Sequence, residues 1–367
     1  LELWQRRRNG SGEVLHAMAS PTRILTVGSI PPEWGGPVAG GVATAHRGVL
    51  EMIVADPRFE LIGVVPTKGV DHSLVPSSVR LFENPSADEY VELVDHVDAV
   101  LMNHVGHRYA DLAEETRGTP TVAVIQSWNR HVEAVDKERN ALRTQRNLDA
   151  MAGLVFVSDF SRQMGIDFGF TYRGRTFVVH NAVPNAYLDS GIERSRRGVL
   201  FVGTLNDRKR ADLVIEACAA LGVPLTIAGD GPNRSALEAQ AAGLEVTFIG
   251  EASEGRVVEL MAAAAALCVP SRSEGFPLVF VEAAASGTPI VGHGPSVGEL
   301  SAVIGRSCGI GVPPNATRGD VMGAITSVLD TSWDHTGMRM ATTAALSSQS
   351  VYTQYLDLLS EVAGSEH

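Results

Sequence analysis

The sequence is poor in cysteine, in aromatic residues and in long apolar runs. It has 3 Cys, and Phe, Trp and Tyr together make up 6% of its 367 residues. Cys218, Cys268 and Cys308 stand far apart in apolar contexts. We therefore expect buried free thiols, and neither a disulfide framework nor a thiolate metal site. No run of about 18 apolar residues occurs, which disfavours a membrane-spanning helix.

Positive charge is also scarce. The chain has 30 Lys+Arg against 42 Asp+Glu, a formal net charge of −12, which disfavours nucleic acid as a partner because like charges repel at long range. Residues 1–22 form a polar leader that contains three consecutive arginines but lacks the apolar segment of a signal peptide. We therefore expect a cytoplasmic protein, and leave open a weak contact of these arginines with an anionic membrane surface.

Short apolar runs alternate with helix-length segments along the first half of the chain. Alternation of this kind is typical of βαβ units and a parallel sheet, and we assign residues 23–184 to a first Rossmann-like domain. The predicted strands cover residues 24–28, 61–65, 99–102, 121–125, 154–157 and 177–179, and the predicted helices cover 43–55, 87–94 and 133–150.

The same pattern restarts after a charged segment without apolar periodicity, residues 185–197, which we interpret as a linker. Residues 198–345 would form a second Rossmann-like domain, and residues 346–367 a C-terminal helix that crosses back to the first domain. Predicted strands here cover residues 199–203, 225–228, 246–249, 266–269 and 289–291, with helices at 212–220, 234–242, 256–264 and 279–285. Two such sheets facing each other would place a ligand cleft between their strand ends.

One segment of the second domain predicts an anion site. A strand ends near Pro270, a turn follows with Glu274 in it, and a helix opens after Pro277 and ends at Gly287. Free N–H groups and the positive dipole end of this helix suit a diphosphate. Glu282, on the same helix, suits the two adjacent hydroxyls of a ribose, because a carboxylate accepts hydrogen bonds.

A cationic loop is expected at the same cleft. Arg208, Lys209 and Arg210 follow the strand that ends at Gly203 and precede a helix. A solvated basic turn would explain the run alone, but its place opposite the predicted helix N-terminus favours a bound anion.

These residues resemble a known family, the retaining glycosyltransferases of the GT-B fold, family four, which move a sugar from a nucleotide diphosphate to an acceptor. Glu274 and Glu282 match the E-x7-E pair of the family, and Lys209 stands where the family places a lysine that neutralises the diphosphate. The resemblance implies that Glu274 contacts the transferred sugar and that Glu282 contacts the ribose. It implies a donor site made of Gly41, Gly203, Lys209, Glu274, Gly275, Phe276, Pro277, Leu278, Val279 and Glu282.

The chain departs from the family pattern at several positions. Thr204 stands where an arginine is common, so Arg208 or Arg210 would have to supply the second cation, and we name Lys209, Glu274 and Arg208 as candidate catalytic residues. Gln126 stands where many members carry a histidine near the sugar. Candidate contacts to sugar or acceptor in this region are Gln126, Trp128 and His131, with a packing role equally open for Trp128.

The likeness implies a front-face displacement in which the protein mainly stabilises charge on the departing diphosphate. The sequence contains no D-x-D pair, so we expect no metal site and no cofactor beyond the nucleotide-sugar co-substrate, with a hydroxyl acceptor of unknown type as the second substrate.

Two alternatives stay open. Residues 294–298 satisfy G-x-S-x-G, which would make Ser296 the nucleophile of a serine hydrolase, with Asp320 or Asp330 and His335 as partners. Thr204 and Gln126 are compatible with a sugar-nucleotide-binding protein that has no transferase activity. The first alternative explains neither the basic loop nor the glutamate pair.

Overall fold

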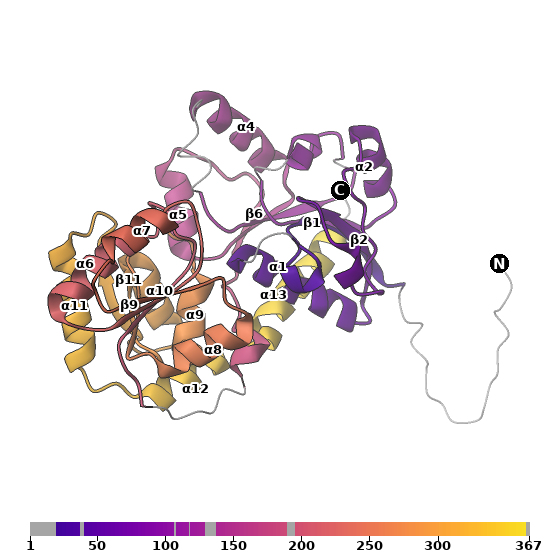
Figure 1. The fold of residues 1–367 in the computed structure, drawn as a ribbon. Coiled ribbons are helices and arrows are strands. Elements are labelled where there is room, and N and C mark those ends of the chain that lie inside the picture. Colours follow the sequence, from indigo (N-terminus) through magenta and orange to yellow (C-terminus); the bar gives the residue numbers. More distant parts are fainter. Residues whose placement is uncertain are drawn as a thin grey trace, which may run out of the picture.

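The chain folds into two α/β lobes joined side by side, with the C-terminal helix reaching back across their boundary (Figure 1). The computed structural model describes residues 20–36, 40–105, 108–116, 118–128, 137–188 and 195–364. Within them no helix combines the length and apolar character needed to cross a bilayer.

The first lobe is built on a parallel six-stranded sheet in the order β2-β1-β3-β4-β5-β6. The central strands β3, β4 and β5 are short apolar runs whose residues are all buried, as helices on either side of a parallel sheet require. The strands are β1 (Thr22–Gly28), β2 (Phe59–Pro66), β3 (Ala99–Met102), β4 (Thr121–Ile125), β5 (Gly153–Phe156) and β6 (Arg175–Val178), and the helices are α1 (Gly41–Ala55), α2 (Ala87–Val94), α4 (Lys137–Ala150) and α5 (Asp159–Asp167).

The second lobe repeats this architecture with a parallel sheet in the order β12-β11-β10-β7-β8-β9. Its strands are β7 (Val199–Val202), β8 (Leu225–Ala228), β9 (Val246–Gly250), β10 (Ala266–Val269), β11 (Ile290–His293) and β12 (Gly309–Val312). Its helices are α6 (Ala211–Leu221), α7 (Arg234–Gln240), α8 (Glu254–Ala263), α9 (Leu278–Ala285), α10 (Gly294–Val303), α11 (Arg318–Asp330) and α12 (His335–Ala345). The predicted class, two facing Rossmann-like domains, is confirmed.

Several elements escaped the sequence analysis. Strand β12 is short, two of its four residues are glycines, and it lies at the sheet edge, so it lacks the continuous apolar run that marked the others. Helix α5 contains a glycine and has low average hydropathy, and only its cap, Ser158 accepting from the Ser161 N–H, marks its start. The predicted helix 133–150 is described from Lys137 onward, and its first four residues lie outside the described part.

The C-terminal helix α13 (Ser348–Ala363) packs on α1 and β3 of the first lobe. Two backbone contacts mark the crossing: the Val183 N–H donates to the Leu346 carbonyl (2.7 Å), and the Ser348 hydroxyl donates to the Val183 carbonyl (3.2 Å). The segment that we expected to be a polar linker begins as a single 3-10 turn, Asn185–Tyr187. This turn buries the aromatic ring of Tyr187, and the assignment of residues 185–197 as a linker stays a prediction.

The two lobes are tied together by Glu299 of α10. Its carboxylate accepts from the backbone N–H groups of Asp159 (2.7 Å) and Phe160 (3.1 Å) at the start of α5, and it lies 3.0 Å from His180 Nε2. A carboxylate at a helix N-terminus is stabilised by the free N–H groups and the helix dipole. Glu299 therefore fixes how the second lobe sits on the first.

We expect Glu299→Gln to destabilise the protein by about 1–3 kcal/mol, because the amide keeps one acceptor oxygen but turns an N–H₂ toward backbone N–H groups. The measurement is the thermal midpoint, which should fall by several degrees. Glu259→Gln is the matched control: its carboxylate forms an exposed pair with Arg256 on α8, and such a pair contributes little. Equal midpoints for the two variants would contradict this role of Glu299.

Candidate functional site

The N-terminus of α9 opens toward the first lobe. The helix begins at Leu278 with Pro277 at its N-cap, and that cap makes no side-chain hydrogen bond. A proline cap leaves the first-turn N–H groups to be satisfied by another partner. The glycine pair Gly40–Gly41 at the start of α1, here called the glycine loop, lies against this turn, because a Cβ on Gly41 would come 3.2 Å from the Leu278 Cβ. The sequence-predicted Gly41 and the α9 N-terminus therefore share one site.

Two cations converge on one carboxylate in the turn before α9. Lys209 Nζ lies 2.7 Å and Arg208 Nη1 2.8 Å from the same atom, Glu274 Oε1. The Glu274 side chain is only 10% exposed. Burial raises the pKa of its carboxyl, but the charges of Lys209 and Arg208 outweigh burial and hold that pKa below its ordinary value. Glu274 is thus ionised, and two positive charges against one negative leave this turn with a net positive charge.

The loop between β7 and α6 sets these cations in place. The Lys209 N–H donates to Asn206 Oδ1 (3.1 Å), and Arg208 Nη1 also donates to the Ser273 carbonyl (2.8 Å). Gly203 lies beside the methylenes of Lys209. Its φ of 151° is a backbone conformation that residues with a side chain rarely adopt. Arg208 supplies the second cation at Glu274, whereas Arg210 lies 3.5 Å from Asp212.

Glu282, the second glutamate of the pair, is placed on α9 beside Tyr187. The Tyr187 hydroxyl hydrogen-bonds its carboxylate. Burial and the nearby charge of Glu254 raise the pKa of Glu282 to about 7, against a smaller opposing effect of the Tyr187 hydrogen bond. Sequence analysis missed Tyr187, because the only signal was an aromatic residue inside a polar segment.

The candidates after β4 divide into three cases. The Gln126 carbonyl occupies the space that a Cβ on Gly275 would need, so Gln126 lies at the lobe boundary and Gly275 has to be glycine. Trp128 is completely buried, with 0% of its surface exposed, and its indole N–H donates to the Ser161 carbonyl (2.7 Å). Its ring stacks on Phe170, so the expected contact with a sugar was wrong and the packing role holds. His131 lies outside the described residues.

The serine hydrolase alternative fails on geometry. Ser296 is 1% exposed in the first turn of α10, 2.9 Å from His293 Nδ1, so no ester could reach its hydroxyl. His335 donates through Nδ1 to the Gly287 carbonyl (2.7 Å), and Asp320 caps α11 through Thr317. Among the described contacts, neither His335 nor either aspartate hydrogen-bonds Ser296.

Comparisons with known proteins point to one class of protein. Residues 189–345 match the family model described as Glycosyl transferases group 1. The two facing Rossmann-like lobes, with a cationic loop opposite a helix N-terminus, define the class as a GT-B fold protein. Over residues 189–345, which make up most of the second lobe, the chain is therefore similar to the group 1 glycosyltransferases.

Relatives of the chain share part of its length. D-inositol 3-phosphate glycosyltransferase of Mycolicibacterium smegmatis is 30% identical over 219 residues, covering 54% of this chain and 50% of that protein. Glycogen synthase of Mycobacterium tuberculosis is 34% identical over 166 residues, covering 42% and 39%. The chain thus matches about half or less of the length of these curated relatives.

Solved structures match over most of the fold. Sucrose-phosphate synthase from Thermosynechococcus elongatus superposes with a TM-score of 0.74 at 16% identity, covering 93% of this chain and 99% of that one. HepE of Anabaena, solved in complex with UDP-glucose, superposes with a TM-score of 0.70 at 16% identity, covering 93% and 100%. At these identities the likeness shows the fold.

We expect Lys209→Ala to weaken binding of UDP or GDP by about 10- to 100-fold, because the substitution removes one charge-assisted hydrogen bond. Titration calorimetry with each nucleotide measures it. Arg210→Ala is the matched control: the same charge is removed one residue away, from a side chain that pairs with Asp212 rather than Glu274. Affinities that fall equally in both variants would contradict the site.

Glu282 makes a second, pH-dependent prediction. Because its pKa is raised from 4.5 to about 7 in the folded protein, stability falls as pH rises from about 4.5 to 7. Above pH 7 the full penalty, on the order of 3 kcal/mol, is present. Glu282→Gln should therefore be more stable than the parent at pH 8 and about equal to it at pH 5.

Thermal midpoints across this pH range, without nucleotide, test the effect of Glu282. Glu238→Gln, at an exposed carboxylate on α7 that pairs with Arg234, should follow the parent at every pH. A Glu282→Gln midpoint below that of the parent at pH 8 would refute the raised pKa.

Proposed function

We propose that the chain is a retaining glycosyltransferase that moves a hexose-type sugar from a nucleotide diphosphate to a hydroxyl acceptor without a metal ion. The observation that carries the proposal is the convergence of Lys209 and Arg208 at the N-terminal turn of α9, within reach of the glycine loop of the first lobe. Cations and free N–H groups at one point suit a diphosphate leaving group.

The charge on this turn favours exchange of partners when a donor binds. Lys209 and Arg208 now share one oxygen of Glu274, and a diphosphate offers more acceptor oxygens and more negative charge to the same two groups. Glu274 would then turn toward the sugar, whose hydroxyls donate to a carboxylate. Glu274 would thus neutralise one unit of the charge of the two cations in the free protein and become available to the sugar in the complex.

In the proposed reaction the bond between the anomeric carbon and the diphosphate oxygen breaks while the acceptor oxygen bonds that carbon on the same face. The acceptor proton passes to the departing phosphate oxygen, and the configuration is retained. Lys209, Arg208 and the α9 N-terminus stabilise the negative charge that develops on the leaving group. The lobes exclude water from the centre, which limits hydrolysis of the donor.

Glu282 is the proposed contact to the ribose of the nucleotide. Its buried carboxylate has a raised pKa, and two ribose hydroxyls donating to it would favour the ionised form. Binding of the nucleotide below pH 7 should then release a proton from Glu282.

A second candidate function is a sugar-nucleotide-binding protein without turnover, which the exposed Thr204 and the glutamine at position 126 favour. The position of Arg208, 2.8 Å from Glu274 Oε1, supports the proposal that Arg208 takes the cationic role of an arginine at position 204, which weakens the first of these two arguments.

The test is incubation of the full chain with UDP-glucose or GDP-mannose and a panel of hydroxyl acceptors, in EDTA, with the anomeric configuration of the product read by NMR. We expect product with the donor configuration retained, at a rate within about twofold of that without EDTA. Inversion of configuration, or a rate abolished by EDTA and restored by Mg²⁺, would overturn the mechanism. Donor binding without any product would favour the second candidate.

Glu274→Gln sharpens this test within the same assay. Removal of the competing carboxylate frees Lys209 and Arg208, so UDP should bind as tightly as to the parent or several-fold more tightly. Turnover should fall by about 100-fold, because the contact to the transferred sugar is weakened. UDP affinity that falls together with turnover would show that Glu274 does not compete with the diphosphate.

A further inference from the structure

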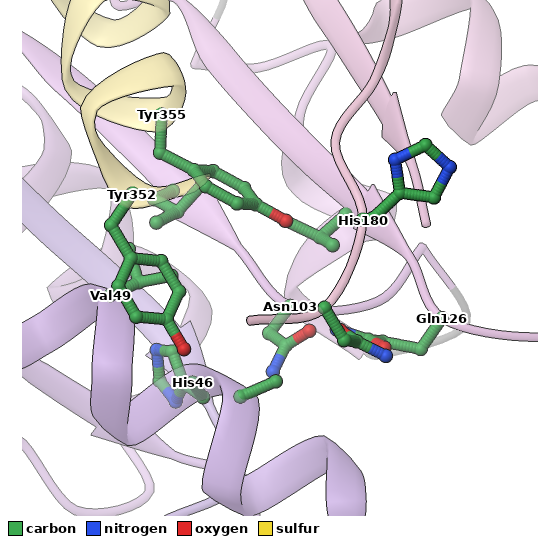
Figure 2. A pocket seen from close by; sticks show the side chains of 11 residues that line it. His46, Val49, Asn103, Gln126, His180, Tyr352 and Tyr355 are labelled. Atoms are coloured by element: carbon green, nitrogen blue, oxygen red, sulfur yellow. The ribbon is translucent and has the colours of Figure 1, made fainter. Parts of the chain in front are cut away.

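The second lobe has a hollow among its helices. It lies between the β7–α6 loop, the first turn of α6, helix α7 and the segment after β10, and its volume is about 270 Å³. Small-molecule sites in proteins have volumes of about 300–1,000 Å³, so this hollow has room for a small ligand. The cavity between α1 and α13 in the first lobe, lined by His46, Asn103 and Tyr352 among others (Figure 2), measures about 10 Å³ and has room for one water molecule only.

The hollow lies on the other face of the second sheet from α9. The chain passes from β7 to β8 and from β8 to β9 in one direction across the sheet, and from β10 to β11 in the opposite direction. Because such crossovers are right-handed, α6 and α7 cover one face and α9 covers the other (Figure 1). Lys209, Glu274 and Glu282 are not among the lining residues of the hollow. A ligand there would occupy a site separate from the proposed donor site.

Arg210 brings a largely buried guanidinium to this hollow without a hydrogen bond. Its side chain is 13% exposed, and its described ion pair is a distance of 3.5 Å from Nε to Asp212 Oδ1. Among the described residues, no oxygen accepts a hydrogen bond from this guanidinium. Buried polar groups are normally hydrogen-bonded, and a guanidinium has five N–H donors. An acceptor placed in the hollow would therefore satisfy donors that the fold does not.

The backbone of Arg210 is strained. It has φ of 57° and ψ of 42° directly before α6, and its side chain does not cap that helix. Residues with a Cβ rarely adopt this left-handed conformation, which glycine adopts without strain. An arginine that neither caps the helix nor donates a hydrogen bond to a described residue gives the fold little in return for this strain. Strain of this kind is typical of functional positions.

Arg272 contributes a second guanidinium to the lining. Its side chain is exposed and forms no ion pair or hydrogen bond with a described residue. Its backbone N–H donates to the Arg208 carbonyl (2.9 Å), which holds the segment after β10 against the β7–α6 loop. Each guanidinium offers paired N–H donors that match two oxygens of an oxyanion. A phosphoryl group has three such oxygens and can meet both guanidinium groups at once.

The remaining polar lining suits hydroxyl groups. Asn233 Nδ2 donates to Asp207 Oδ1, and Gln240 Nε2 donates to the Asp212 carbonyl (3.2 Å). These contacts use the amide N–H groups and leave carboxylate and amide oxygens as acceptors on the walls of the hollow. Hydroxyl groups are the neutral donors that such oxygens take.

The charges of the lining limit how many anionic groups the ligand carries. Arg210 and Arg272 are balanced by Asp207 and Asp212, and the described lining contains no further Lys, Arg, Asp or Glu. A second anionic group would therefore lie against the two carboxylates, which disfavours a nucleoside diphosphate. One phosphoryl group at the arginines and an uncharged, hydroxylated remainder match the whole lining.

We propose that this hollow binds a phosphate monoester of a polyhydroxyl compound. The phosphoryl group contacts Arg210 and Arg272, and the hydroxyl groups contact the carboxylate and amide oxygens of the β7–α6 loop and α7. The proposal goes beyond the transferase function and does not rest on it.

The first test is titration calorimetry of the full chain with glucose 6-phosphate, in the presence of saturating UDP so that Lys209 and Arg208 are occupied. We expect saturable binding at one site per chain. Inorganic phosphate and glucose should each bind about 10-fold more weakly or less, because each lacks one part of the contacts. No binding of glucose 6-phosphate would overturn the proposal. Equally tight inorganic phosphate, or tighter glucuronate, would overturn the assignment to a phosphate monoester.

The second test locates the bound phosphate with variants. Arg272→Gln, at an exposed side chain, and Arg210→Gly, whose backbone conformation glycine adopts without strain, should both fold and raise the dissociation constant of glucose 6-phosphate by about 10-fold. Arg318→Gln is the matched control: it removes the same charge from an exposed arginine at the start of α11, which packs on α6. This control should change the constant by less than about twofold.

The variants also separate this proposal from the proposed function. A dissociation constant that stays unchanged in Arg272→Gln and Arg210→Gly, or that rises equally in Arg318→Gln, would overturn the site in the hollow. A chain that binds no UDP would contradict the proposed function alone, because glucose 6-phosphate is then titrated into the free chain and the same three variants decide.

Discussion

The site depends on one buried interaction, the sharing of the Glu274 carboxylate by Lys209 and Arg208. Two cations at this depth, 12% and 25% exposed, would be strongly unfavourable if nothing neutralised them. Glu274 neutralises one unit of charge and leaves one in excess. The free protein is therefore folded around a site that is already positive, and the proposed diphosphate ligand would complete the neutralisation that Glu274 begins.

The boundary between the lobes is made largely of backbone. The Ser158 hydroxyl donates to the Gly275 carbonyl (3.1 Å), and Asn181 Nδ2 donates to the Phe276 carbonyl (2.6 Å). Glu299 binds two backbone N–H groups of α5 on the other side. These contacts hold the turn before α9 against the first lobe without using Glu274, Lys209 or Arg208. The side chains proposed to meet a ligand are therefore not needed to hold the lobes together.

Two features of the molecule are unfavourable for stability and favourable for binding. The buried Glu282 carboxyl resists ionisation, and His46 and Asn103 bury acceptors with no described donor. A ligand that donates hydrogen bonds would relieve each of them.

The sequence by itself determined the two parallel sheets, because buried parallel strands are continuous apolar runs. It also predicted that Lys209 and Glu274 lie close together, because both follow strand ends on one edge of the second sheet. It could not decide which arginine joins Lys209, since Arg208 and Arg210 differ only in where the loop turns them, and it could not separate packing from binding at Trp128. Tyr187, Glu299 and the cavity of His46 were decided by tertiary structure alone. Each depends on segments that are distant along the chain, and the packing of α13 on α1 is a property of the whole fold that no local pattern encodes.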